Sequence, residues 1–355
     1  MNLLGLTEKK MFDFDREKLE GYINKLNQPR VLIIGDMGID EMVYGDTERI
    51  SREAPVLILR HSNTKIILGQ AANAANNLAT INEGKVSAIG LYGDDYYGPT
   101  LLDAFKNAGI NTEYMVKDAN RPTTVKSRIS GASFHSVTQQ IVRIDRVDET
   151  ALSQEIEDKI IENIEKAVPL HDAVILSDYN IGLLTDRIIE SAVNAGKKHG
   201  KIVVADVQKD MHRYKGVYAL TPNQPDSEKA AGYFIRDKKT LNNAGADILK
   251  MTDAQVLLLT RGGDGMAVFE RNKETHTDVP VFNKTNVFDV TGAGDTVVAS
   301  FTLALAAGAE PKYAAIIGNI AASIVIRSFG CATTNISEIQ KSLSKMNMEN
   351  YTIKV

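Results

Sequence analysis

Short runs of apolar residues recur along the chain, and each has the length and composition of a buried β-strand. The runs occupy residues 31–34, 86–89, 173–176, 202–205 and 256–260. The first ends directly at a glycine, as a strand that enters a turn often does. These runs predict the strands of one large sheet.

Segments with the pattern of amphipathic helices lie between the apolar runs. Residues 153–167 begin with Ser153, a good N-cap, and residues 185–199 are followed by Gly200, a good helix stop. Strands that alternate with helices of this length indicate a parallel sheet covered on both faces. The pattern therefore predicts an α/β fold, a three-layer sandwich with a mostly parallel central sheet.

Two regions depart from this alternation and are rich in β-prone residues. They cover about residues 41–67 and 121–147. We interpret them as antiparallel strands outside the main sheet that together form a small lid; the alternative is an edge extension of the main sheet. The chain, residues 1–355, is then a single domain that carries a β lid.

Composition narrows the possible functions. Of 355 residues, 43% are hydrophobic and 24% charged, and the formal net charge of −4 argues against broad nucleic-acid binding. The single cysteine, Cys331, excludes an intramolecular disulfide and a cysteine zinc cluster. The first residues have no signal-peptide core, and the apolar stretch 297–309 is too short to span a bilayer. We expect a cytoplasmic protein with no nucleic-acid or membrane partner.

The strongest chemical signal is the segment DVTGAGD, residues 289–295. Its glycines allow a tight turn with several N–H groups pointing the same way, and the apolar run after it predicts a helix whose N-terminus favours negative charge. Such a loop suits a phosphoryl group during transfer. Asp295 at its mouth could accept the proton of an attacking hydroxyl. The alternative is that Asp295 only caps the helix.

DVTGAGD is similar to the C-terminal signature of the ribokinase-like, or PfkB, carbohydrate kinases, and the resemblance covers about residues 30–340. Within that family, the sequence at residues 45–56, 176–179 and 220–223 resembles that of the D-glycero-D-manno-heptose 7-phosphate kinases. The resemblance implies a ribokinase-like fold and ATP-dependent phosphorylation with Mg²⁺. In many members of the family a monovalent cation such as K⁺ also binds.

The resemblance also implies roles for individual residues. The catalytic set is the base Asp295 with the anion loop Gly292, Ala293 and Gly294. The sugar-binding set is Asp36, Asp40, Gly69, Asn73 and Arg143. The nucleotide set is Asn223, Asp226, Thr260, Gly262 and Gly265. Asp226 would also hold Mg²⁺ through water, and a monovalent cation would lie near Asp289, Thr291 and residues 330–334. For Asp36 a turn-forming role after the strand is an equal alternative.

Three positions depart from the family pattern. Gln70 replaces the second glycine of a Gly-Gly pair at the lid hinge, and Ile181 and Gln208 stand where lysines are typical, although Lys209 could substitute for the second. Without these lysines there is less positive charge near the phosphates, where phosphoryl transfer needs it. Two alternatives therefore stay open: a slow enzyme, or a homologue that only binds a ligand. A different sugar, sugar-phosphate or nucleoside acceptor also stays open. A dehydrogenase is disfavoured, because no Gly-x-Gly-x-x-Gly follows the first strand.

A phosphorylated acceptor needs cationic groups at the far end of its pocket. Candidates in the lid are Arg49, Lys126, Arg128 and Arg143, for each of which a solvent-facing position is the alternative. The acceptor that the resemblance implies is the anomeric hydroxyl of heptose 7-phosphate, and the product is the 1,7-bisphosphate of lipopolysaccharide-core precursor synthesis. With 355 residues we expect no fused nucleotidyltransferase domain, so that a separate enzyme performs the later step. We also expect a homodimer that pairs through the lid.

Overall fold

The structure is a computed structural model, and it describes residues 9–132, 138–282, 287, 289–328, 330–345 and 352–354. Its largest element is an eight-stranded sheet in the order β15-β14-β13-β12-β11-β10-β2-β5. All pairs from β13 to β5 are parallel, and β14 and β15 are antiparallel. The strands are β2 (Val31–Gly35), β5 (Val86–Ile89), β10 (Ala173–Asp178), β11 (Ile202–Val207), β12 (Ala219–Leu220), β13 (Val256–Thr260), β14 (Met266–Glu270) and β15 (Thr277–Val279).

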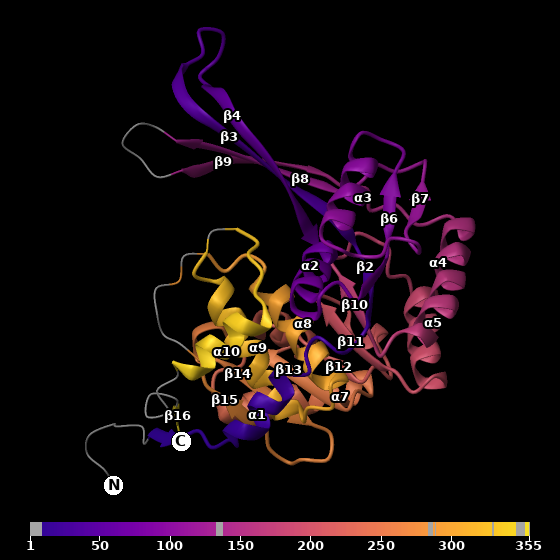
Figure 1. The fold of residues 1–355 in the computed structure, drawn as a ribbon, viewed down its shortest axis with the longest axis vertical. Helices are drawn as coiled ribbons and strands as arrows, with labels where there is room; N and C mark the ends of the chain where they lie inside the picture. Colours follow the sequence, from indigo (N-terminus) through magenta and orange to yellow (C-terminus); the bar gives the residue numbers. More distant parts are fainter. Residues whose placement is uncertain are drawn as a thin grey trace.

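Helices cover both faces of this sheet (Figure 1). One face packs against α1 (Arg16–Ile23), α2 (Ala71–Asn82), α3 (Tyr97–Asn107), α8 (Ala293–Ala306), α9 (Pro311–Val325) and α10 (Ile336–Ser344). The other packs against α4 (Gln154–Ala167), α5 (Asp186–Lys198), α6 (Gln224–Ala231) and α7 (Lys238–Thr252). Strand residues alternate between the two cores: Ile33 faces the first and Ile34 the second.

The predicted alternation of strands and helices is confirmed. The five apolar runs are strands of the main sheet. Ser153 caps α4 by accepting from the Ile156 N–H, and Gly200, with φ +63°, follows the end of α5. The local signals succeed here because caps and apolar runs act over only a few residues.

The lid is a separate sheet of four strands in the order β4-β3-β8-β9, which projects from the body (Figure 1). The strands are β3 (Met37–Ile50), β4 (Leu57–Gln70), β8 (Val125–Ala132) and β9 (Gln139–Arg146). The edge-extension alternative is therefore wrong. The expectation of antiparallel strands needs one correction, because the two antiparallel hairpins join through a parallel pair, β3 with β8. β3 also begins before residue 41, directly after β2, and β4 runs straight into α2.

The register of the lid sheet sorts its side chains onto two faces. One transverse row joins Ile67, Asp40, Lys126 and Asp145, and the next joins Lys65, Met42, Arg128 and Arg143. The opposite face carries the row Ile66, Glu41, Ser127 and Ile144. Because partners in register share a face, Asp40, Lys126, Arg128, Arg143 and Asp145 gather on one side of the lid, and Glu41 lies on the other.

Two small sheets and three short helices complete the fold. The sheets pair β1 (Lys9–Met11) with β16 (Thr352–Lys354) and β6 (Leu91–Gly93) with β7 (Val116–Asp118). The short helices are η1 (Val168–Leu170), η2 (Met211–Arg213) and η3 (Gly262–Asp264). Within the described residues, no helix has the length and apolar character needed to cross a bilayer.

Candidate active site

A pocket lies where the carboxyl ends of β10 to β13 meet the N-terminus of α8. Parallel strands bring their following loops to one edge of a sheet, which is the usual ligand site of such folds. The residues that line it are Tyr179, Asp206, Val207, Gln208, Thr221, Pro222, Asn223, Asp226, Thr260, Gly292, Gly294 and Asp295. The pocket thus unites predicted residues from segments that lie far apart in the chain.

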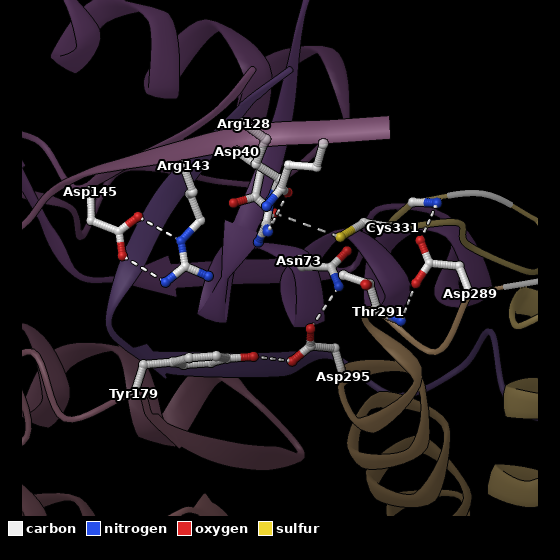
Figure 2. A network of polar contacts seen from close by, with 12 residues as sticks. Asp40, Asn73, Arg128, Arg143, Asp145, Tyr179, Asp289, Thr291, Asp295 and Cys331 are labelled. Carbon is white, nitrogen blue, oxygen red and sulfur yellow. Dashed lines mark hydrogen bonds and ion pairs between the residues drawn. The ribbon is translucent and has the colours of Figure 1, made fainter. Parts of the chain in front are cut away.

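Asp295 lies in the first turn of α8 and is buried. Both of its carboxylate oxygens accept hydrogen bonds: Oδ2 from Asn73 Nδ2 and Oδ1 from the Tyr179 hydroxyl, each at 2.6 Å (Figure 2). The Asn73 amide is oriented in turn by Asn77, whose Nδ2 donates to the Asn73 backbone carbonyl at 3.0 Å and to its side-chain oxygen Oδ1 at 3.5 Å. The carboxylate is therefore held in one orientation at the pocket wall.

The predicted anion loop begins at Gly292, which is the N-cap of α8 with φ +77°. A Cβ at this position would lie 2.7 Å from Asn73 Nδ2, so the glycine permits both the turn and the close approach of α2. Ala293 and Gly294 are the first residues of the helix, whose early N–H groups have no partner within it. The positive end of α8 therefore opens on the pocket beside Asp295.

The pocket raises the pKa of two carboxyl groups. Burial raises the pKa of Asp295 to about 6; the charge of Asp40 adds to this, while the Tyr179 and Asn73 hydrogen bonds and the Lys126 charge oppose it. Burial and the charge of Asp295 raise the pKa of Asp206 to about 7, against a hydrogen bond from Thr221. A site with this much negative charge favours a cationic ligand beside any phosphate.

Three of the predicted nucleotide residues, Asn223, Asp226 and Thr260, line the pocket. Asn223 caps α6 by accepting from the Asp226 N–H at 2.8 Å, and it forms a bridge with Thr260 at the end of β13. Gly262 and Gly265 lie in the turn between β13 and β14, outside the residues that line the pocket. A Cβ at Gly265, where φ is +83°, would lie 2.2 Å from the Val279 carbonyl oxygen, so the turn itself requires this glycine.

Three of the predicted sugar residues, Asp40, Gly69 and Arg143, belong to the lid. Asp40 is buried and faces the Arg128 guanidinium at 3.6 Å, and a Cβ at Gly69 would lie 3.0 Å from the Asp40 backbone nitrogen. Arg143 is half-exposed and forms a two-point ion pair with Asp145 (Figure 2). The lid thus places both carboxylates and guanidinium groups on this side of the site.

Lys126 extends over the ring of Tyr179, with its amine 5.8 Å from the ring centroid. Burial lowers the pKa of Lys126, and the charges of Asp40 and Asp145 oppose that effect. This amine therefore lies between the lid and the pocket, within the electrostatic reach of Asp40 and Asp295.

Two of the predicted residues, Asp36 and Arg49, are not placed to contact a substrate in the pocket. The Asp36 carboxylate accepts the backbone N–H groups of Tyr179, Ile181 and Leu183, so its geometry favours the structural alternative. Arg49 lies nine residues along β3 from Asp40, about 30 Å at the usual strand rise, and is exposed near the tip of the lid. Arg49 is therefore not near the site.

The residues predicted for a monovalent cation link two loops. Asp289 accepts the Thr291 N–H at 2.9 Å and the Gly330 N–H at 3.0 Å. Burial alone would raise the pKa of Asp289, but these hydrogen bonds outweigh it and hold the pKa below its usual value. In the described part of the chain, no three His, Cys, Asp or Glu residues come together as a metal-binding group.

Sequence reasoning assigned no role to Tyr179 or Asp206, although both lie at the pocket. Each stands at the carboxyl end of a predicted parallel strand, Tyr179 directly after β10 and Asp206 one residue before the end of β11. The rule that ligands bind beyond these strand ends could have identified them. Tyr179 donates to Asp295 and Asp206 accepts from Thr221, contacts that no sequence spacing encodes.

Comparison with known proteins gives a family. The sequence profile described as pfkB family carbohydrate kinase matches residues 28–338. A protein named bifunctional protein HldE from Desulfatibacillum aliphaticivorans is 39% identical over 318 residues, which are 88% of this chain and 63% of that protein. One of the same name from Nitratiruptor is 36% identical over 327 residues, 91% of this chain and 68% of that protein. The chain thus spans about two thirds of these relatives.

Solved structures share the fold. The ribokinase of Arabidopsis thaliana complexed with ribose and ATP has a TM-score of 0.67 at 18% identity, and the match covers 90% of this chain and 99% of that one. Phosphofructokinase-2 from Escherichia coli in complex with potassium has a TM-score of 0.71 at 16% identity, covering 89% and 99%. At such identities the likeness concerns the fold alone.

Proposed function

Since the chain belongs to the pfkB family of carbohydrate kinases, we propose that it transfers the γ-phosphoryl group of ATP to a phosphorylated sugar. The acceptor that we propose is D-glycero-D-manno-heptose 7-phosphate, at its anomeric hydroxyl. The observation that carries the proposal is the position of Asp295 between the N-terminus of α8, which suits an anion, and the lid face with Asp40 and Lys126. Identity of 33–39% to proteins named HldE supports this acceptor over an unrelated sugar.

In the proposed reaction Asp295 accepts the proton of the acceptor hydroxyl as its oxygen bonds to the γ-phosphorus. The bond from that phosphorus to the oxygen it shares with the β-phosphate breaks, and ADP leaves. The amides of residues 292–294 stabilise the charge of the transferring group, for which one donor is typically worth about 3 to 4 kcal/mol. Asn73 and Asp40 orient the acceptor beside the base, since carboxylates and amides bind sugar hydroxyls well.

The donor set fits Mg²⁺, which prefers oxygen ligands and often takes only one or two carboxylates in addition to water and phosphate. Asp226 and Asp206 both line the pocket, and we propose that they hold the ion, Asp226 through water. The bound ion would neutralise phosphate charge there. The same oxygen chemistry at Asp289, Thr291 and residues 330–334 leads us to propose K⁺ as a second, weaker ligand.

An acceptor with its own phosphate needs a cation at its far end, and Lys126 is the residue that we propose. It shares a lid face with Arg128 and Arg143, whose ion pairs are with Asp40 and Asp145. We expect Lys126→Met to raise the KM of the phosphorylated acceptor about tenfold or more and to leave the KM of ATP unchanged, since a hydrogen bond to a charged group is worth about 1.5 to 3 kcal/mol. Lys117→Met, which removes an amine on β7 paired with Asp94, is the control.

Release of ADP with a panel of sugars and sugar phosphates tests the proposed function. We expect turnover with heptose 7-phosphate and a loss of about 10²–10⁴-fold in Asp295→Asn, with ATP binding retained. Asp247→Asn is the matched control, because that carboxylate does not line the pocket and accepts a hydrogen bond from the half-buried Tyr233. ATP binding without turnover of any acceptor would refute the kinase assignment, and turnover of another sugar alone would refute the acceptor.

A further inference from the structure

Tyr179 lies in the pocket beside the proposed base, Asp295. It is the first residue after β10, its ring lines the pocket, and its hydroxyl donates to Asp295 Oδ1 at 2.6 Å (Figure 2). Asn73 donates to the other carboxylate oxygen. Each oxygen keeps a second lone pair, so an acceptor hydroxyl can still donate to Asp295 while both protein bonds remain. The two bonds prevent the carboxylate from rotating away from the acceptor.

The loop that carries Tyr179 is held by Asp36, which directly follows β2. Asp36 Oδ2 accepts from the N–H groups of Tyr179 at 2.8 Å and Ile181 at 3.2 Å, and Oδ1 accepts from Leu183 at 3.2 Å. Asp36 is buried and does not line the pocket. Three charge-assisted bonds to one short loop fix the backbone from which the Tyr179 ring extends.

A second carboxylate also holds this loop. Asp178 accepts the Asn180 N–H at 2.8 Å and also the hydroxyl of the fully buried Tyr214. The loop is therefore tied to the core of the main sheet on both sides. A loop held this way is already ordered, so substrate binding loses little conformational entropy there. The supporting residues of a catalytic site need this kind of preorganisation.

We infer that Tyr179 and Asp36 are positioning residues of this site: the Tyr179 hydroxyl holds Asp295 in its productive orientation, and Asp36 holds Tyr179. This inference rests on the proposed role of Asp295 as base. It replaces a sugar contact for Asp36 with a structural task, and it assigns Tyr179 a task that the sequence did not indicate. The contacts can also be tested in the absence of an acceptor.

Kinetics test the hydroxyl first. Tyr179→Phe keeps the ring, its contact with Lys126 and the backbone bonds to Asp36, and removes one bond. We expect kcat to fall about tenfold to a hundredfold with the KM of ATP unchanged, because small misplacement of a catalytic group has effects of this size. Tyr233→Phe, which removes a hydroxyl bonded to Asp247 at 2.8 Å and outside the residues that line the pocket, should leave kcat and both KM values unchanged. Wild-type kcat in Tyr179→Phe would overturn the inference.

The pH profile gives a second kinetic readout. The groups whose charge acts on Asp295 include Asp40 from β3 and Lys126 from β8, and Asp206 on β11 lies across the pocket. The Tyr179 bond lowers the Asp295 pKa, so its loss should move the acidic limb of kcat/KM to higher pH. A purely structural role for Tyr179 would leave that limb in place.

Asp36→Asn tests the bonds that hold the loop, because an amide NH₂ cannot accept a backbone N–H. We expect the same direction of change as in Tyr179→Phe and almost no further loss in the double variant, since Asp36 acts through Tyr179. If the falls in kcat of the two single variants multiply in the double variant, Asp36 does not act through Tyr179. If Asp36→Asn does not fold, Tyr179→Phe still tests the hydroxyl alone.

Two measurements on the acceptor-free protein separate this inference from the proposed function. The backbone amides of residues 179–183 should exchange hydrogen faster in Asp36→Asn than in wild type. The change in unfolding free energy caused by Asp295→Asn depends on pH, and that dependence should move to higher pH when Tyr179→Phe is also present. If no acceptor is phosphorylated but both effects occur, the contacts stand and the kinase assignment fails; absence of both effects overturns the inference whatever the activity.

Discussion

At the scale of single residues, Asp295 illustrates a conflict between the catalytic role that we propose for it and the stability of the fold. Its folded pKa of about 6 lies above the ordinary 3.8, because burial disfavours the charge. A carboxyl group with a raised folded pKa contributes its full stability below the unfolded pKa and loses it as the pH rises through the folded pKa. We therefore expect Asp295→Asn to gain unfolding free energy relative to wild type between about pH 4 and pH 7. Urea unfolding across this range measures it, and a gain that does not grow with pH would contradict the pKa.

Gly292 and Gly294 form a matched pair within one loop. Gly292 has φ +77° and a Cβ there would lie 2.7 Å from Asn73 Nδ2, whereas a Cβ at Gly294 meets nothing within 4 Å. We expect Gly292→Ala to lower the unfolding free energy by about 1 to 3 kcal/mol and Gly294→Ala to raise it by about 0.5 to 1 kcal/mol. Thermal unfolding of both variants checks the contrast, and equal effects would contradict it.

At the scale of elements, the hinge between β4 and α2 is under local strain. Gln70 has φ 57° and ψ −134°, a backbone conformation that favours glycine, and its side chain is buried. Neither polar atom of its amide has a hydrogen-bond partner among the described residues. The sequence identified Gln70 as a departure from the family, and the dihedral angles show the physical consequence: strain and unpaired amide atoms each cost about 1 to 3 kcal/mol.

We predict that Gln70→Gly raises the unfolding free energy by about 1 to 2 kcal/mol, after the entropy cost of a glycine is subtracted. Gln70→Ala separates the two sources, because it removes the amide and keeps the strained backbone; its gain should be smaller. Chemical unfolding of the three proteins measures the order. A loss of stability in Gln70→Gly would mean that the amide has a role that this geometry does not explain.

The elements also set the limit of what the sequence predicts. Apolar runs and helix caps located β2, β5, β10, β11, β13, α4 and α5, because those signals act within a few residues. The parallel pairing of β3 with β8 joins segments that are distant in the chain, such as Ile39 with Val125, and no local pattern specifies such a pair. The same holds for the site: a motif predicted Asp295, whereas Tyr179 reaches it because α8 packs beside β10, a contact between segments that are distant in the chain.

At the scale of the whole molecule, the lid leaves apolar side chains uncovered. Its face away from Asp40 carries Ile66, Val142 and Ile144, which are 37%, 46% and 46% exposed. Within the described residues, the edge strands β4 and β9 of the lid sheet each pair on one side alone. Exposed apolar side chains clustered on such a sheet commonly mark a protein contact. This arrangement is what we expect of a lid through which two copies pair.

We predict that the wild-type protein is a dimer and that Ile144→Asp makes it a monomer, because a buried unpaired carboxylate in an apolar contact costs several kcal/mol. Leu170→Asp is the control: Leu170 is 53% exposed in η1, away from the lid, and its change should leave the dimer intact. Sedimentation velocity at several concentrations distinguishes the two states. A monomeric wild type, or a dimer that survives Ile144→Asp while Leu170→Asp dissociates it, would refute pairing through this face.

Because the lid also carries Asp40 and Lys126, loss of the dimer should raise the KM of the acceptor more than that of ATP.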